Sequence, residues 1–236
     1  MSEIYLIRHG QASFGQENYD RLSVLGMRQA KWVGRHLAEL GRSFDAIYCG
    51  RLARQKKTAE ALVAEYARAG LKTPTLTISK AFDEYDSTAV WESQIQQMAA
   101  EDPAVAETLN DIYSDPKTFQ RLFAKVMVRW VSGEFDRPGV QRWRDYRRQV
   151  QEGFQELMRR HGSKKRLAVF TSGGPICIAV QTALDLSDRM AIELNWQIMN
   201  ASVTRLLYNA GGMALSVFND VTHLETAGDT GLISYR

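Results

Sequence analysis

The chain has 236 residues and a mass of 26.7 kDa, a size typical of one large domain or of one domain with an insertion. Apolar residues make up 44% and charged residues 24%, which allows a sizeable core and is ordinary for a globular protein. No apolar run approaches the ~18–20 residues of a membrane span, and the N-terminus enters the first predicted strand without room for a signal peptide. Cys49 and Cys177 lie in or beside apolar runs, as core thiols do, so we expect a cytoplasmic protein.

The net charge of +3 is distributed unevenly along the chain. Residues 137–166 carry ten basic and three acidic side chains, and such a face could attract an anionic substrate or a nucleic acid. A solvated helix face accounts for the same residues. We favour the solvated face and expect no nucleic-acid partner and no membrane contact.

The first half of the chain alternates strands and helices. Residues 4–7 form an apolar run that ends in Arg8, His9 and Gly10, which indicates a buried strand. A helix that begins after Ser23 and ends near Gly41 follows. The next expected elements are a strand at 44–49, a helix at 53–68 and a strand at 74–78. This order is typical of a parallel sheet covered by helices.

The alternation stops in the middle of the chain. Residues 81–133 contain no convincing strand, and their best helical pattern runs from Phe119 to Trp130 with apolar residues three and four positions apart. We interpret this stretch as a helical insertion over the edge of the sheet, an element of the kind that caps an active site. Its apolar stripe is interpreted as packing rather than as a ligand site.

The second half returns to the sheet. A long helix from Val140 to Gly162 precedes a strand at 166–171, a glycine-containing turn and a helix that continues through Leu184. Two further runs, 202–208 and 214–218, predict a closing antiparallel pair. The expected fold class is therefore α/β: a three-layer α/β/α sandwich with a mostly parallel central sheet. Residues 1–236 form one domain, with a helical lid insertion at about 85–138.

Chemistry-bearing residues follow four of these strands, and ligands of open α/β sheets bind at the carboxyl ends of the strands. Arg8 and His9 suit an anion and a reaction near neutral pH, and Arg54 could grip the same phosphate. Glu84 lies among aromatic residues, where burial favours its acid form, and the turn at 172–175 precedes a helix N-terminus. Each has a structural alternative: a surface ion pair, a solvated carboxylate or a tight turn.

These residues resemble the motifs of the histidine phosphatase superfamily, also called the phosphoglycerate mutase-like proteins. Residues 6–10 read Leu-Ile-Arg-His-Gly, and residues 52–59 are similar to the family's Leu-x-Arg-x-x-Gln-Thr-Ala, although Lys57 replaces the glutamine. Glu84 falls where the family has its acid. Two more stretches match, 169–174 and 219–224, so the resemblance covers both ends of the chain and leaves the central insertion without a match.

One position departs from the family pattern. The fourth motif usually reads Ser-His-Gly, and here Ser172 stands in place of the second catalytic histidine. We expect His36 and His161 to be surface residues, because both fall on helix faces or ends. His223 is near a strand end and is the one other histidine that could reach the pocket.

The resemblance implies a phosphomonoester hydrolase, of the histidine acid phosphatase type, that works through a phosphohistidine on His9 and needs no metal or other cofactor. Glu84 is the expected proton donor. The expected ligands of the substrate phosphate are Arg8, Gln11, Arg54, Ser172, Gly173 and His223. Two alternatives stay open: an impaired protein that binds a phosphorylated ligand without turnover, and a phosphoglycerate-type mutase. The partner is a small phosphorylated substrate of undetermined identity, and the sequence leaves the oligomeric state undetermined.

Overall fold

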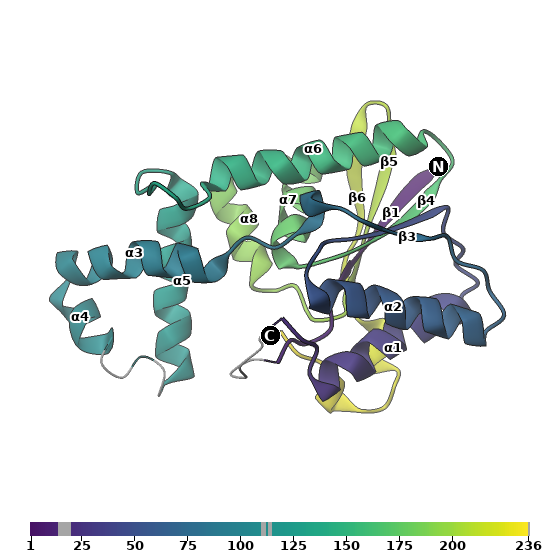
Figure 1. Cartoon of the computed structure of the whole chain (residues 1–236), viewed down its shortest axis with the longest axis horizontal. Coiled ribbons are helices and arrows are strands. Elements are labelled where there is room, and N and C mark those ends of the chain that lie inside the picture. The colour runs from purple at the N-terminus through teal and green to yellow at the C-terminus, as the bar shows by residue number, and fades with distance from the viewer. Residues whose placement is uncertain (14–19, 110–111, 113–114, 236) are drawn as a thin grey trace.

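A computed structural model describes residues 1–13, 20–109, 112 and 115–235 of the chain (Figure 1). In this described part six strands form one sheet in the order β3-β2-β4-β1-β5-β6. β1, β2, β3 and β4 run parallel, and β5 pairs antiparallel with both β1 and β6. The strands are β1 (Ser2–Arg8), β2 (Ala46–Cys49), β3 (Leu76–Ile78), β4 (Arg166–Thr171), β5 (Val203–Asn209) and β6 (Gly212–Asp220).

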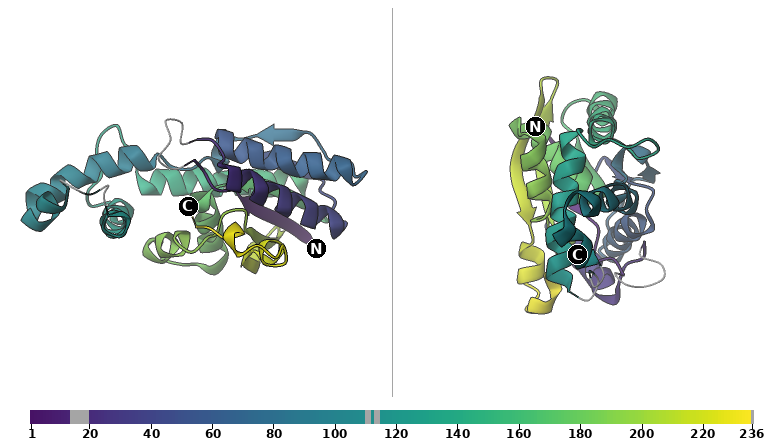
Figure 2. Two further views of the ribbon diagram at one scale, coloured as in Figure 1. Left: turned by 90° about the horizontal axis from the view of Figure 1, so that it is seen from below. Right: turned by 90° about the vertical axis from the view of Figure 1, so that its left-hand side faces the viewer.

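Helices cover both faces of the sheet, as the two views of Figure 2 show. Side chains alternate along β1: Tyr5 and Ile7 pack with α1 and α2, whereas Ile4 and Leu6 pack with α6 and α7. The expected three-layer α/β/α sandwich is therefore confirmed. Its covering helices are α1 (Val24–Glu39), α2 (Ala53–Arg68), α6 (Trp143–His161), α7 (Gly173–Leu184) and α8 (Asp188–Asn195).

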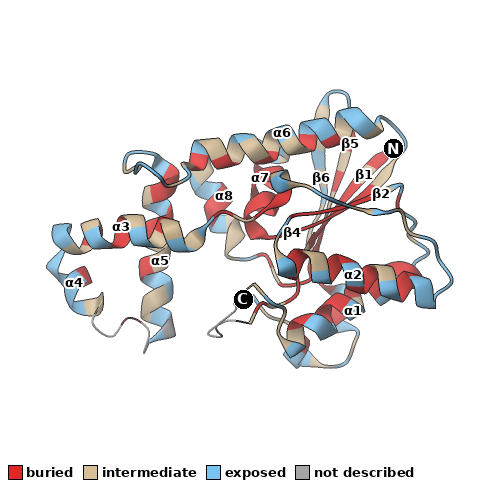
Figure 3. Cartoon of the chain, in the orientation of Figure 1, coloured by how far each residue is buried: buried red, intermediate tan, exposed pale blue. Residues whose placement is uncertain are grey.

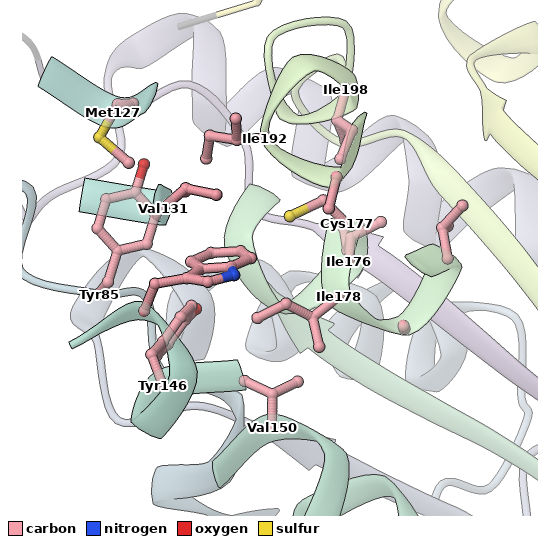
Figure 4. Close-up of a cluster of buried hydrophobic side chains, with 14 of the residues drawn as sticks. Tyr85, Met127, Val131, Tyr146, Val150, Ile176, Cys177, Ile178, Ile192 and Ile198 are labelled. Atoms are coloured by element: carbon pink, nitrogen blue, oxygen red, sulfur yellow. The ribbon is translucent and has the colours of Figure 1, made fainter. Parts of the chain in front are cut away.

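The central insertion is helical, as expected, and projects from the sheet on the side toward which β1 runs (Figures 1 and 2). Its helices α3 and α5 pack on each other, and their apolar residues continue the core that lies under α6 and α7 (Figure 3). Figure 4 shows part of that shared core, with Met127 of α5 close to Tyr85. The insertion comprises α3 (Ser87–Glu101), α4 (Pro103–Leu109) and α5 (Pro116–Ser132), and η1 (Lys80–Phe82) directly precedes it.

Residues 185–201 carry no predicted element, but the structure places α8 there, with Ser187 as its N-cap. It also places α9 (Thr222–Glu225) and η2 (Thr230–Leu232) after the last strand. β3 is shorter than predicted and β6 is longer. Among the described residues, no helix combines the length and the apolar character that crossing a membrane requires.

Candidate active site

His9 follows the end of β1 and is almost fully buried, with 5% of its surface exposed. Its Nδ1 lies 2.7 Å from the Gly10 carbonyl oxygen, which can only accept, so Nδ1 carries the proton. Its Nε2 accepts a hydrogen bond from Arg54 Nε at 3.1 Å. Burial, together with the charges of Arg54 and Arg8, holds the pKa of His9 well below its ordinary value, although the Gly10 contact opposes this. The ring is therefore a neutral imidazole near pH 7, with its basic nitrogen directed at a guanidinium.

Arg54 lies in the first turn of α2 and is buried. Its Nη1 forms an ion pair with Asp20 Oδ1 at 2.8 Å, and Asp20 Oδ2 accepts from the Ala53 backbone N–H at 2.7 Å. The carboxylate thus lies at the positive end of a helix and against an arginine, which together favour an anion. This position accommodates an oxyanion, and Asp20 fills it here.

The Glu84 side chain is half-buried where η1 leads into α3. Gly174 N donates to one carboxyl oxygen at 3.2 Å, and Tyr85 N and the Tyr146 hydroxyl donate to the other, each at 3.2 Å. Burial raises the pKa of Glu84, although the two backbone donors and the charges of Arg54 and Arg8 oppose the shift. A Cβ on Gly174 would lie 2.1 Å from Glu84 Oε1, so the acid needs glycine there.

Ser172 precedes α7 and is fully buried. Its hydroxyl accepts a hydrogen bond from Gln55 Nε2 at 2.8 Å, and the same amide group donates to the Phe82 carbonyl at 3.0 Å. Gln55 therefore joins α2, η1 and the start of α7. Position 172 therefore holds a small hydroxyl that the amide group of Gln55 fixes in place.

The segment between α8 and β5, residues 196–202, holds the backbone around Arg8 and His9. Arg8 Nη1 donates to the Ile198 carbonyl, and to the Tyr235 carbonyl at 2.9 Å. The His9 carbonyl accepts from Ala201 N at 3.1 Å. Asn219 in turn fixes this segment, because its side chain accepts from Met199 N at 2.8 Å and donates to the Gln197 carbonyl at 2.7 Å.

Gln11 and His223, expected as phosphate ligands, make their contacts elsewhere. Gln11 Oε1 accepts from the Ser23 hydroxyl at 2.8 Å, at the start of α1. His223 is buried and stacks on His36 at 5.7 Å between ring centroids, and its Nε2 has no hydrogen-bond partner among the described residues. Burial and the neighbouring His36 lower the pKa of His223 to about 4. These contacts support the fold around α1 and α9 and give no support to a phosphate-binding role.

The structure thus brings together residues from four strand ends: His9, Arg54, Glu84 and the Ser172 turn. Sequence reasoning missed Asp20, Gln55 and Tyr146. Nothing in their local sequence marked them, because Tyr146 matched the apolar pattern of a helix and Asp20 is one acid in a polar loop. Among the described residues, no group of three or more His, Cys, Asp or Glu side chains is arranged to hold a metal ion.

Comparisons with known proteins agree with this fold. The family profile of the Histidine phosphatase superfamily (branch 1) matches residues 4–132 and 114–221, and the chain belongs to this superfamily. A 2,3-bisphosphoglycerate-dependent phosphoglycerate mutase of Tropheryma whipplei (strain Twist) is 35% identical over 79 residues. That alignment covers 31% of this chain and 36% of the relative.

Solved structures show the same fold at low identity. A mutant phosphoserine phosphatase from Entamoeba histolytica, in complex with phosphoserine, is 21% identical, with a TM-score of 0.66 over 95% of this chain and 100% of that one. A phosphoglycerate mutase from Bacillus anthracis is 16% identical, with a TM-score of 0.63 over 97% of each chain. A putative alpha-ribazole-5'-P phosphatase from Escherichia coli is 15% identical, with a TM-score of 0.61 over 93% of this chain and 98% of that one. Proteins with this fold thus include both phosphatases and mutases.

Proposed function

We propose that this protein hydrolyses phosphomonoesters through a phosphohistidine formed on His9. The observation that carries the proposal is the contact between His9 Nε2 and the Arg54 guanidinium at 3.1 Å. A neutral imidazole, kept so by a lowered pKa, has a lone pair on the nitrogen that lies beside a phosphate-binding cation. The relative that binds phosphoserine supports a small phosphorylated substrate.

In the first step His9 Nε2 attacks the phosphorus in line, the phosphorus–oxygen bond to the leaving group breaks, and an N–P bond forms. Arg54 exchanges its contacts with His9 and Asp20 for the equatorial oxygens of the phosphoryl group, and Arg8 adds a second cation. Glu84, whose pKa is raised by burial, gives its proton to the departing alkoxide.

In the second step a water molecule gives a proton to the Glu84 carboxylate and attacks the phosphorus. The N–P bond breaks, phosphate leaves, and His9 and protonated Glu84 are restored. In this cycle Glu84 donates and then regains one proton, and the N–P bond on His9 forms and then breaks.

Ser172 supports a phosphatase that turns over slowly or accepts a narrow range of substrates. A serine hydroxyl offers one neutral hydrogen bond where an imidazole would offer a charge, and loss of one transition-state donor costs on the order of 10²–10³ in rate. The same substitution supports the second candidate, a protein that binds a phosphorylated ligand without turnover. A mutase is a weaker candidate, because it must also protect its phosphoenzyme from water.

The deciding experiment measures phosphate release from a panel of phosphomonoesters, with acid-quenched samples examined for phosphoenzyme. We expect the wild-type protein to turn over and the His9→Ala variant to lose both activity and label. Full activity in His9→Ala would refute the phosphohistidine. Tight binding of phosphomonoesters by a wild-type protein that releases no phosphate would favour the ligand-binding candidate.

A further inference from the structure

The Ser172 hydroxyl group is buried at the start of α7, and its hydrogen has no acceptor among the described residues. Ser172 has no exposed surface. Its oxygen accepts a hydrogen bond from Gln55 Nε2 at 2.8 Å, and no described residue accepts one from its O–H group. A buried donor without an acceptor costs free energy, and such donors are rare in folded proteins. The unused hydrogen therefore points to a ligand.

The orientation of the Gln55 amide group decides that the Ser172 oxygen accepts. Leu52 N, which can only donate, lies 3.3 Å from Gln55 Oε1, and the Phe82 carbonyl oxygen, which can only accept, lies 3.0 Å from Gln55 Nε2. The second hydrogen of Nε2 is then directed to Ser172. The Phe82 carbonyl cannot take the serine hydrogen, because Thr171 Oγ1 also donates to it at 2.7 Å and its two lone pairs are in use.

The ordinary structural use of a serine at this position is excluded by its neighbours. Ser172 is the N-cap of α7, and an N-cap serine oxygen usually accepts from the N–H group of the second or third helical residue. Here the second residue, Gly174, donates to Glu84 at 3.2 Å, and the third, Pro175, has no N–H group. The Ser172 side chain accordingly makes no capping hydrogen bond. Helix capping does not explain this hydroxyl group.

Ser172 and Gln55 both lie next to groups that contact the candidate nucleophile. Ser172 follows Thr171, whose carbonyl oxygen accepts from His9 N at 2.9 Å. Gln55 follows Arg54, whose Nε lies 3.1 Å from His9 Nε2. Adjacent Cα atoms are about 3.8 Å apart, so each partner is one residue away from a contact of His9. The unused hydrogen thus belongs to the candidate active site.

We propose that Gln55 is a positioning residue, which holds the Ser172 oxygen as an acceptor so that the Ser172 hydroxyl group donates to an oxygen of the substrate phosphoryl group. An ionised phosphoryl oxygen only accepts hydrogen bonds, so it suits a donor whose hydrogen has no other acceptor. Gln55 contributes through Ser172 and does not itself contact the substrate. This inference rests on the proposed function, because it takes the phosphoryl group to be held by Arg54 beside His9.

The test is a double-mutant cycle of Ser172→Ala and Gln55→Met, with kcat/KM measured for 4-nitrophenyl phosphate. We expect Ser172→Ala to lower kcat/KM about tenfold, the equivalent of one hydrogen bond. Gln55→Met leaves the hydroxyl group but not its fixed direction, so we expect a fall of about threefold. When Ser172→Ala is already present, Gln55→Met should cause no further fall, because the group through which Gln55 acts is absent.

The matched control is Gln94→Met in α3. Gln94 is also buried, and its amide group also donates to a backbone carbonyl and a serine hydroxyl, those of Phe135 at 2.9 Å and Ser93 at 3.4 Å. We expect this variant to leave kcat/KM unchanged with or without Ser172→Ala. Thermal unfolding of each variant reports on folding. Ser172→Ala removes a single buried oxygen, so it tests the donor even where Gln55→Met does not fold.

Two results would overturn the proposal. An unchanged kcat/KM in Ser172→Ala would show that the hydroxyl group does not contact the phosphoryl group. A Gln55→Met effect of the same size in the wild-type and Ser172→Ala backgrounds would show that Gln55 acts on the fold and not through the hydroxyl group.

Failure of the proposed function gives a different result, because wild-type protein then releases no phosphate from 4-nitrophenyl phosphate or from the wider panel. The same cycle is in that case measured by calorimetry, with inorganic phosphate as the ligand. An affinity about tenfold lower in Ser172→Ala, with no further loss in the double variant, supports the donor and its positioning by Gln55. Equal affinities of the wild-type protein and Ser172→Ala refute them.

Discussion

Tyr146 shows how a single buried hydroxyl can tune the candidate acid. Its hydroxyl group lies 3.0 Å from the Asp83 carbonyl oxygen and 3.2 Å from Glu84 Oε1. Burial, with Glu84 nearby, raises the pKa of Tyr146 well above its ordinary value, so the phenol stays protonated and donates. The ring itself packs on Tyr85 at 5.6 Å in the shared core of Figure 4.

We therefore expect Tyr146→Phe to lower kcat/KM about tenfold, the equivalent of one lost hydrogen bond. Loss of a donor to the carboxylate raises the pKa of Glu84 further, so the alkaline limb of the pH–rate profile moves to higher pH. A pH profile of kcat/KM checks both effects. The control is Tyr48→Phe, which loses a hydroxyl contact to His161 at 2.8 Å away from the site. A kcat/KM that falls at every pH without a shift of the alkaline limb would contradict the role of Tyr146 in positioning Glu84.

Ser172 gives a second prediction at the residue scale. Because Gln55 lies 2.8 Å from the serine hydroxyl, an imidazole at position 172 needs the space that this amide fills. We expect the double variant Ser172→His, Gln55→Ser to raise kcat on the order of 10²-fold, since it restores a charged donor. The comparison is with Gln55→Ser alone. Equal rates for the two variants would show that the pocket does not use a second histidine.

At the scale of elements, the segment between α8 and β5 connects Asn219, in the C-terminal motif, with Arg8 at the candidate active site. Asn219 adopts a left-handed backbone conformation, with φ of 57°, and its side chain holds the backbone on both sides of Ile198. Ile198 in turn accepts Arg8. Asn219, in the motif at 219–224, therefore fixes the backbone carbonyl that accepts a hydrogen bond from Arg8.

Replacement of Asn219 by glycine keeps the backbone conformation accessible and removes only the side-chain contacts. We expect Asn219→Gly to raise KM several-fold with a smaller change in kcat, because Arg8 loses its fixed acceptor, and to lower the free energy of unfolding by about 1–3 kcal/mol. Asn219→Ala adds backbone strain and should destabilise further. Steady-state kinetics test the rise in KM, and urea unfolding tests whether Asn219→Ala is less stable than Asn219→Gly. An unchanged KM in both variants would argue against a role of Asn219 in positioning Arg8.

At the scale of the whole molecule, His223 makes stability depend on pH. Its pKa is about 4 in the folded protein and about 6.5 in the unfolded chain. Below pH 6.5 the unfolded state takes up a proton that the folded state refuses, so the free energy of unfolding falls as the pH falls toward 4. The loss from this one group amounts to about 3 kcal/mol.

The variant His223→Asn removes this titration and keeps a polar side chain at the position. Urea unfolding at pH 8, 6 and 4 is expected to show a wild-type loss about 3 kcal/mol greater than the loss in the variant. For each protein, the free energy of unfolding at pH 8 is the reference from which its loss at lower pH is measured. Parallel pH dependences in the two proteins would rule out His223 as the source.

Much of this architecture was predictable from the chain. Apolar runs that end in Arg8, Thr171 or Cys49 indicated buried strands, and the rule that strand ends share one edge brought His9, Arg54, Glu84 and Ser172 together. α8 was missed because residues 188–195 carry three charges that hide the two buried positions Ala191 and Ile192.

The support around the site was not predictable, for a physical reason. Gln55 and Asn219 act through contacts between segments far apart in the sequence, and no local pattern records such contacts. The position of His223 after a strand suggested the pocket, and its ring packs on His36 of α1, so its role as a phosphate ligand stays a prediction. Residue type and sequence position predicted the candidate reacting groups, whereas tertiary packing decides which polar residues support them.

Under the proposed function, Asp20 is a competitor of the substrate that is attached to the chain itself. Its carboxylate is bound to Arg54 at 2.8 Å and to the start of α2, and a group attached to the chain is present at a high local concentration. An incoming phosphate would bind Arg54 only by displacing this carboxylate, so its net affinity would be the difference between the affinities of two anions. The structure thus holds the basic nitrogen of His9 beside an arginine whose charge Asp20 already balances.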